Sequence, residues 1–442
     1  MYFVCFVVNH PFMQTYLLKH ATLATLYPAK IEQADLRVAE GKIIEKGAEL
    51  PRRDGDIEVD CSGKLMLPGM VCAHTHLYSA LARGMPGPKE PPINFPQILE
   101  KVWWKLDRAL DEEAIYYSAV AGILDAIACG TTTIIDHHAS PGCISGSLKI
   151  MKEAFEMLGM RGVLCYEVTD RGGEAERDQG IEENRWLLEH QSELVKGLVG
   201  AHAAFTLSDE SLKMCAGLVR AYQTGIHIHL AEDVCDVKTS LDQYDKSVAS
   251  RLASFGLLND KSLLAHGVHV SREELAWIRN IWCWLIHNPR SNMNNAVGYA
   301  PIDEFGDRAA LGTDGISSNM FEEIKCMYFK AQDEKVPFGP EECIRFLNGG
   351  QRIASTLFGL PIGALEVGAA ADLIVLDYPS PTPIHAGNLG GHLIFGMTHA
   401  HVDSVMIAGK FVLQNRHFTH PDATAFYQQA QQAAAKLWQR MS

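Results

Sequence analysis

Short apolar runs alternate with longer amphipathic stretches through the middle of the chain. Eight runs are rich in β-branched or apolar residues, and they span residues 69–76, 131–136, 162–168, 197–203, 225–230, 262–267, 282–287 and 308–314. Helix-compatible stretches separate most of them, and one of these stretches begins after Asp111, a typical N-cap residue, and ends before Gly130. This alternation predicts parallel strands joined by crossover helices.

The number of runs defines the expected architecture. Eight strands with crossover helices over about 250 residues have the count and size of a (β/α)8 TIM barrel. We therefore predict an α/β fold in which residues 69–362 form a catalytic barrel. The carboxyl ends of all eight strands of such a barrel open on one face, where the active sites of this fold lie.

Both ends of the chain carry a different pattern. Alternating strands with glycine turns occur before the barrel in "DLRVAEGKIIEKG" and "DIEVDCSGKLMLPG", and after it in "GALEVGAAADLIVLDY" and "VDSVMIAGKFV". Each set is too small to fold alone. We expect residues 1–68 and 363–442 to pair into one composite β-sandwich domain with a C-terminal helix.

Polar residues end every one of the eight runs. They are His74 and His76, Asp136 and His137, Glu167, His202, His229, His266, His287 and Asp314. Side chains two positions apart on a strand point the same way, so His74 and His76 form a pair, and paired imidazoles suit a metal ion. A core or surface histidine could explain any one of these residues, but not readily all of them on one rim.

Charge and cysteine content narrow the function classes. The formal charge of −14 and the absence of a Lys/Arg cluster argue against a nucleic-acid or membrane surface, which leaves small-molecule chemistry. Eleven cysteines without a CxxC pair favour a reducing cytoplasm. The opening "MYFVCFVV" lacks a basic region and is too short to span a bilayer, so we expect neither a signal peptide nor an anchor there.

Five ordered motifs resemble a known family. "PGMVCAHTHLYSALARG", "HLAED", "AHG", "NPRSNM" and "LGTDG" look like the amidohydrolase superfamily, and within it the aminohydrolase branch of guanine and cytosine deaminases and triazine hydrolases. "VWWKLDRALDEE", "IDHHASP" and "RSNMNN" bring the chain closest to the SsnA-type aminohydrolases. The resemblance covers residues 18–440 and implies an enzyme acting on C–N bonds other than peptide bonds.

The resemblance implies a metal site of one divalent ion. Its ligands would be His74, His76, His229 and Asp314, and three imidazoles with one carboxylate suit Zn2+ first and Fe2+ as an alternative. Related enzymes with two metals carry a bridging lysine after strand three or four, and this chain has none there. His227 lies deeper on the same strand face, and we expect it to orient a ligand.

Three residues would carry the chemistry by the same resemblance. Glu232 would be the proton shuttle between the attacking water and the leaving nitrogen. His266 would orient the water and steady charge on the substrate, and Asp314 would act both as ligand and as catalytic residue. The alternative for His266 is a satisfied interior histidine.

The substrate contacts form a looser set. We expect them to be His202, His137, Trp103, Trp104, Arg290 and Asn292. Either tryptophan could instead be a core residue of its helix, and Arg290 could pair with an oxo or carboxylate group. Asn295 stands where many relatives carry an apolar residue, so the substrate of those relatives does not transfer directly.

The leading hypothesis is a hydrolase that deaminates a purine, pterin or pyrimidine type of heterocycle and releases ammonia. The alternatives are hydrolytic opening of a cyclic amide or imide in purine breakdown, dechlorination of a triazine-like ring, and a catalytically inactive assembly protein. We further expect a homodimer or larger homo-oligomer with no nucleic-acid or membrane partner.

Overall fold

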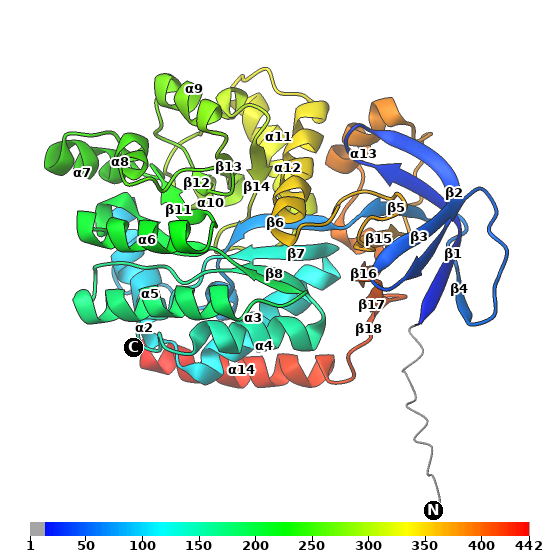
Figure 1. Ribbon diagram of the computed structural model, residues 1–442, viewed down its shortest axis with the longest axis horizontal. Coiled ribbons are helices and arrows are strands. Elements are labelled where there is room, and N and C mark those ends of the chain that lie inside the picture. Colours follow the sequence, from blue (N-terminus) through cyan, green and yellow to red (C-terminus); the bar gives the residue numbers. More distant parts are fainter. Residues whose placement is uncertain (1–13, 442) are drawn as a thin grey trace, which may run out of the picture.

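The computed structural model describes residues 14–441, so the opening segment "MYFVCFVV" lies outside the described residues. Figure 1 shows a large body wrapped by helices and, beside it, a smaller body made mainly of strands. Within the described range, no helix is long and apolar enough to cross a membrane. Every cysteine among these residues is a free thiol.

Each of the eight predicted runs contains a parallel strand of the large body, and the fourth run is split in two. The strands are β6 (Met70–Thr75), β7 (Thr131–Asp136), β8 (Arg161–Leu164), β9 (Val195–Gly197), β10 (Val199–Ala203), β11 (Ile226–Leu230), β12 (Leu263–His266), β13 (Trp284–His287) and β14 (Ala309–Leu311). Almost all of their residues are buried, as expected of parallel strands covered by helices on the outside.

The strands are ordered as in a TIM barrel. One sheet runs β6-β7-β8-β9 and the other β10-β11-β12-β13-β14. Single parallel bridges between Thr75 and Asp314 and between Val168 and Ala201 join the two sheets at both edges, in place of continuous ladders. The predicted fold class is confirmed, and the Thr75–Asp314 bridge places the ends of the first and last strands side by side.

Helices follow the strands and cover the outside of the barrel (Figure 1). They are α3 (Glu112–Ala128), α4 (Ser147–Leu158), α5 (Glu174–Glu189), α6 (Asp209–Ala221), α7 (Val234–Tyr244), α8 (Val248–Ser254), α9 (Arg272–Ile281), α11 (Met320–Asp333) and α12 (Pro340–Phe358). As predicted, Asp111 caps α3, because its side chain accepts from the Ala114 amide. Helix α12 approaches β14 so closely that a Cβ on Gly349 would lie 1.8 Å from the Ala309 carbonyl oxygen.

Short helices lie in the loops that cross the carboxyl ends of the strands. After β6 come η1 (Leu77–Ala82), α1 (Phe95–Ile98), η2 (Leu99–Trp103) and α2 (Trp104–Ala109), and later loops contain η3 (Ala204–Thr206), α10 (Pro289–Asn294) and η4 (Ile302–Glu304). These elements form the walls above the barrel. The first loop is the longest, and it places the "VWWKLDRAL" segment over the rim.

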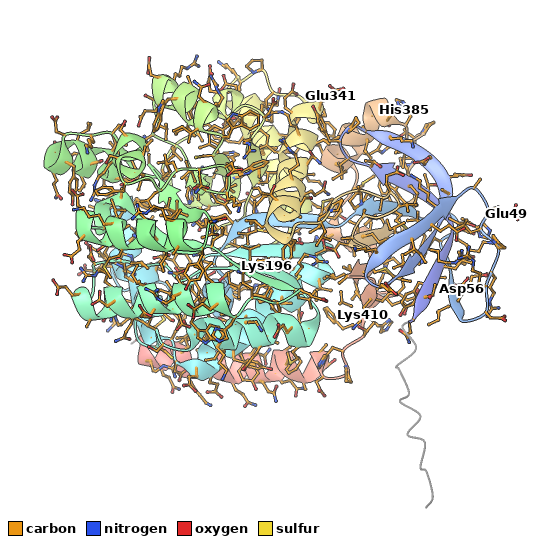
Figure 2. The ribbon with its side chains drawn as sticks, viewed as in Figure 1. Glu49, Asp56, Lys196, Glu341, His385 and Lys410 are labelled. Atoms are coloured by element: carbon orange, nitrogen blue, oxygen red, sulfur yellow. The ribbon has the colours of Figure 1, made fainter. Side chains whose placement is uncertain are left out.

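The smaller body is one nine-stranded sheet built from both ends of the chain. Its strands are β1 (Thr15–Thr25), β2 (Lys30–Ala39), β3 (Lys42–Gly47), β4 (Asp56–Asp60), β5 (Leu65–Pro68), β15 (Leu373–Leu376), β16 (Val402–Ile407), β17 (Lys410–Gln414) and β18 (His417–Phe418). Antiparallel pairing of β5 with β15 joins the two parts. The strands enclose a small apolar core that includes Leu18, Leu36 and Leu373. Figure 2 labels Asp56 and Lys410 on this sheet, and Asp56 accepts from the Arg37 guanidinium at 3.1 Å.

The C-terminal helix α14 (Ala423–Arg440) packs on the barrel, although we grouped it with the β domain. Figure 1 shows it along the lower edge, and it contacts α3, η1 and α2. Its apolar face is buried, including Phe426 and Leu437, and Trp438 donates to the Leu81 carbonyl at 2.9 Å. Hydrophobic periodicity predicts this helix but does not indicate which part of the molecule it packs against. The short α13 (Leu389–Phe395), η5 (Ala386–Asn388) and η6 (His399–His401) lie between β15 and β16 in the chain.

Candidate active site

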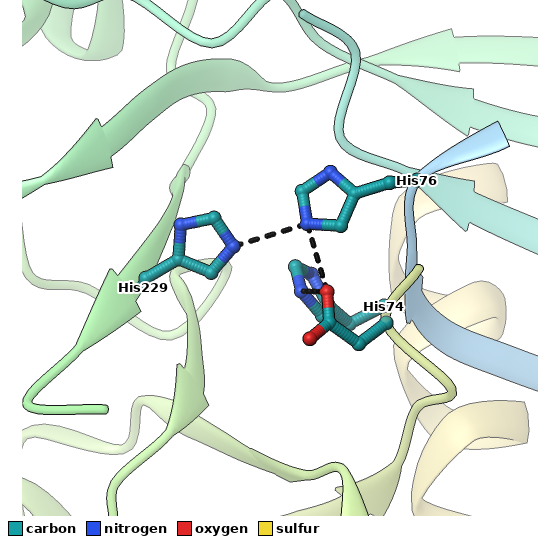
Figure 3. Close-up of side chains that lie close together, drawn as sticks. His74, His76 and His229 are labelled. Carbon is teal, nitrogen blue, oxygen red and sulfur yellow. Dashed lines mark hydrogen bonds and ion pairs between the residues drawn. The ribbon is translucent and has the colours of Figure 1, made fainter. Parts of the chain in front are cut away.

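Four side chains from distant strands meet at the carboxyl end of the barrel. His74 and His76 come from β6 and its end, His229 from β11, and Asp314 from the turn after β14. The Nε2 atom of His76 lies 3.1 Å from Nε2 of His229 and 3.0 Å from Oδ1 of Asp314. His74 Nε2 lies 3.6 Å from the same oxygen. Figure 3 shows the three labelled imidazoles turned toward one another, and one ligand atom from each of the four side chains lies within 4.8 Å of the others.

The other ring nitrogen of each imidazole is held from behind. His74 Nδ1 lies 2.8 Å from His227 Nε2. His76 Nδ1 lies 2.6 Å from the His137 carbonyl oxygen, and His229 Nδ1 lies 2.8 Å from the His202 carbonyl oxygen. Hydrogen bonds of this kind fix ring orientation and leave Nε2 free for a metal. His74 Nε2 is buried and has no hydrogen-bond partner in residues 14–441.

This donor set fits a divalent metal ion. Three imidazole nitrogens and one carboxylate are ligands of Zn2+ or Fe2+, and a catalytic site of this type keeps a position for water. Burial would raise the pKa of Asp314, but the adjacent imidazoles of His74 and His76 outweigh it and hold this pKa well below its usual value. A carboxylate that stays ionised in a buried site is the form that binds a metal.

Glu232 and His266 lie beside this group. His266 Nε2 is 3.5 Å from Glu232 Oε2 and 3.8 Å from Asp314 Oδ2. Burial raises the pKa of Glu232 to about 7, so this carboxyl can both accept and release a proton near neutral pH. His266 and Asp314 have φ values of 75° and 55°, in the left-handed region that non-glycine residues rarely adopt. Strained backbone of this kind is concentrated at functional sites.

Helix α10 holds three of these groups from one side. Asn292 Oδ1 lies 2.8 Å from His266 Nδ1, and Ser291 donates to Asp314. Asn295, directly after the helix, donates weakly to Glu232 Oε1 at 3.4 Å. One short helix therefore orients His266, Asp314 and Glu232 together.

A cavity of about 250 Å³ opens above the four convergent side chains. Of the residues predicted to contact substrate, His202, Trp103 and Trp104 line it. The other residues of its wall are His76, Tyr78, Ser79, Phe95, Leu99, Asp107, Glu167, His229, Glu232, Ser291, Asn294, Asn295, Asp314, Gly315 and Ile316. Both tryptophans are thus placed to stack on a planar ring.

Three residues that we predicted as substrate contacts do not line this cavity. His137 is fully buried below it, where Nε2 meets the His227 carbonyl at 3.0 Å. Asn292 is buried and bound to His266. Arg290 pairs with the fully buried Glu323 and donates to the Ser317 carbonyl at 2.6 Å, because its place on α10 turns it toward α11.

Sequence reasoning missed most of the wall. Tyr78, Ser79, Phe95 and Asp107 come from the long loop after β6, where no strand or long helical period indicates which side chains face inward. Glu167 ends the third run, but the sequence assigns it no role. Its Oε2 lies 3.2 Å from His137 Nδ1. The signal available for Glu167 was its place on the rim of the barrel.

Known proteins resemble this chain along nearly its whole length. A 5'-deoxyadenosine deaminase of Methanobrevibacter smithii is 29% identical over 437 residues, covering 96% of this chain and 98% of that protein. A 5-methylthioadenosine/S-adenosylhomocysteine deaminase of Caldanaerobacter subterraneus subsp. tengcongensis is 28% identical over 439 residues, with 95% and 98% covered. These relatives support the resemblance seen in the sequence motifs.

A solved structure agrees with the fold. An adenosine deaminase from Xanthomonas campestris with bound zinc superposes with a TM-score of 0.84 at 22% identity, covering 96% of this chain and 98% of that one. The profile of the Amidohydrolase family matches residues 65–412, which include the barrel strands β6 to β14 and the four convergent side chains. The chain therefore belongs to the amidohydrolase family.

Proposed function

We propose that this protein is a metal-dependent deaminase that replaces the amino group of a purine-type heterocycle by a hydroxyl group and releases ammonia. The observation that carries the proposal is the meeting of His74, His76, His229 and Asp314 beside the buried Glu232, in a cavity with aromatic walls. The relatives named above, which are deaminases of adenosine-derived compounds, support the choice of a purine.

The same four side chains would hold one metal ion, and we propose zinc. When bound, the ion supplies a Lewis acid that lowers the pKa of water and prepares it for attack on an sp2 carbon. The zinc in the Xanthomonas campestris structure supports this choice. The absence of a lysine at the ends of β8 and β10 supports a single ion.

Glu232 would move the proton. With a pKa of about 7, its carboxylate takes a proton from the attacking water and passes it to the nitrogen that leaves. His266 would steady the developing charge through Nε2, a buried atom without a hydrogen-bond partner in the described structure. Asn292 keeps that nitrogen directed at the reacting atoms, since it occupies Nδ1. Asp314 would accept from the attacking water while it holds the ion.

We extend the proposal to assembly and location. We propose a homodimer or larger closed homo-oligomer in the cytoplasm, because the chain carries a net charge of −14, free thiols and no basic patch for another class of partner. Light scattering at micromolar concentration is the test, and a monomer would remove the assembly claim.

Ammonia release by zinc-loaded protein tests the reaction. Adenine, guanine, 5'-deoxyadenosine, a pterin and a dihydropyrimidine would be incubated separately and read by an ammonia assay and by mass. Deamination adds about one mass unit with ammonia, whereas hydrolytic ring opening adds about eighteen without it. Turnover of a purine with ammonia supports the proposal; ring opening, or no product from any compound, overturns it.

A further inference from the structure

One corner of the cavity carries acidic and aromatic side chains that the proposed reaction does not use. Trp104 and Asp107 come from α2, Glu167 follows β8, and His202 lies on β10. Glu232 and Asn295 line the same cavity from positions after β11 and α10. We call the first four residues the acidic corner. The inference below rests on the proposed function and concerns the class of its substrate.

Asp107 is the central residue of the acidic corner. It is 1% exposed, and its Oδ2 atom accepts from the Arg171 guanidinium at 2.8 Å. Its Oδ1 atom is buried and has no hydrogen-bond partner in the part of the chain that the structure describes. An unpaired buried carboxylate oxygen is costly, and a ligand N–H or O–H would remove that cost.

Arg171 already pairs with Asp107, although its Nε atom is buried without a hydrogen-bond partner among the described residues. Its guanidinium stacks over the Trp104 ring at 4.6 Å and lies 4.0 Å from Glu167 Oε1, in addition to its bond with Asp107. One cation therefore faces two buried carboxylates. No lysine or arginine is among the residues that line the cavity in residues 14–441.

The histidine and tryptophan of the acidic corner contribute ring nitrogens and no permanent cation. His202 Nδ1 lies 2.7 Å from the Thr206 hydroxyl, which leaves Nε2 facing Glu167 at 3.8 Å. Trp104 Nε1 is buried without a hydrogen-bond partner among the described residues and can only donate.

We propose that the acidic corner binds an uncharged or cationic substituent of the heterocycle that donates hydrogen bonds, and that it excludes phosphate and carboxylate substituents. A hydroxyl or amino group satisfies Asp107, whereas an anion in this corner would be buried directly against the carboxylates of Asp107 and Glu167. Like charges brought together in a desolvated site repel each other strongly. The acidic corner thus selects among adenosine-derived compounds by charge.

The test compares a nucleoside and a nucleotide with the same base. Zinc-loaded protein is assayed for ammonia release from 5'-deoxyadenosine and from adenosine 5'-monophosphate. We expect kcat/KM for 5'-deoxyadenosine to exceed that for the monophosphate by about tenfold or more. Equal or faster turnover of the monophosphate by the wild-type protein overturns the proposal.

Asp107→Asn tests the proposal by a change in substrate preference, which misfolding would not produce. It removes one carboxylate and frees Arg171, so the ratio of kcat/KM between the nucleoside and the nucleotide should fall about tenfold, with an absolute gain for the monophosphate. Arg171→Met should raise the same ratio, because it removes the cation. Lys105→Gln, an exposed charge change on the same helix, is the control and should leave the ratio unchanged.

The outcomes separate this inference from the reaction itself. If 5'-deoxyadenosine yields ammonia but Asp107→Asn does not change the ratio of kcat/KM, the proposal for the acidic corner is wrong. The deaminase proposal is then unaffected. If no nucleoside yields ammonia, the deaminase proposal fails, and calorimetric Kd values of the same two ligands on zinc-loaded protein decide the charge preference. If Asp107→Asn does not fold, the wild-type ratio and Arg171→Met still decide it.

Discussion

At the scale of single residues, the direction of each imidazole separates ligands from supporting histidines. His74 and His76 present Nε2 to the common centre, whereas His227 presents Nε2 to His74 Nδ1. Removing a ligand deletes a bond to the metal, but removing His227 deletes only the hydrogen bond that orients one. Losses of the second kind reduce metal affinity by about 10- to 100-fold.

We therefore predict that His74→Ala and His76→Ala each empty the site, with parallel loss of activity. His227→Ala should keep the metal when zinc is in excess, although its melting temperature should fall because a fully buried ring is lost. Metal content and melting temperature of the three proteins, measured side by side, test this. If His227→Ala loses the metal while His74→Ala or His76→Ala retains it, the assignment of the metal ligands is wrong.

A second prediction at this scale concerns Glu232. Glu232→Gln keeps the shape and the Asn295 contact but removes the proton acceptor, so turnover should fall by at least about 10²- to 10⁴-fold with the metal retained. Steady-state kinetics and elemental analysis of the same sample check both parts. Loss of the metal would mean that Glu232 is itself a ligand.

At the scale of elements, the position of α10 depends on a buried ion pair. Arg290 joins this helix to Glu323 of α11, and Glu323 is 0% exposed at the side chain. Arg290→Met would leave that carboxylate buried without its cation, and the free energy of unfolding should fall by about 3–5 kcal/mol. Chemical denaturation measures this fall.

The matched control is Arg185→Met. Arg185 forms an exposed pair with Glu182 on α5, so its removal should change stability by about 0.5 kcal/mol or less. Adding Glu323→Gln to Arg290→Met should recover part of the loss, because the buried charge disappears. Wild-type stability of Arg290→Met together with a raised KM would instead make Arg290 a substrate contact.

Elements also explain how far the sequence could predict the structure. The eight strands follow from short apolar runs between helical patterns. The two-residue period of a strand then gives His74 and His76 a shared direction. On α10 the helical period turns Ser291 and Asn295 to one face and Arg290 to another, and a six-residue segment is too short to reveal that period. The direction of Asp107 depends on Arg171, 64 residues away, so no local pattern contains it.

At the scale of the whole molecule, one metal ion would join strands from opposite ends of the barrel sequence. His74 and His76 belong to the first strand, and Asp314 follows the last. An ion that binds only the folded state adds about 4 kcal/mol of stability when its free concentration is about 1,000 times Kd.

Removal of the metal should consequently lower the melting temperature, and readdition of zinc should restore it. Elemental analysis of the loaded protein should give about one transition-metal ion per chain, because four ligand side chains complete one site. Two tightly held ions per chain, or a melting temperature that a chelator does not change, would contradict this prediction.

The contact between Thr75 and Asp314 also has a consequence for biosynthesis. His74, which precedes Thr75, and Asp314 are 240 residues apart in the chain. At a synthesis rate of about 5–20 residues per second, Asp314 is added roughly 12–48 s after His74. During that interval the growing polypeptide has a histidine pair but no carboxylate to complete the ligand set. A metal ion bound by all four side chains would therefore be acquired only after translation of the last barrel strand, as a late step in the maturation of this protein.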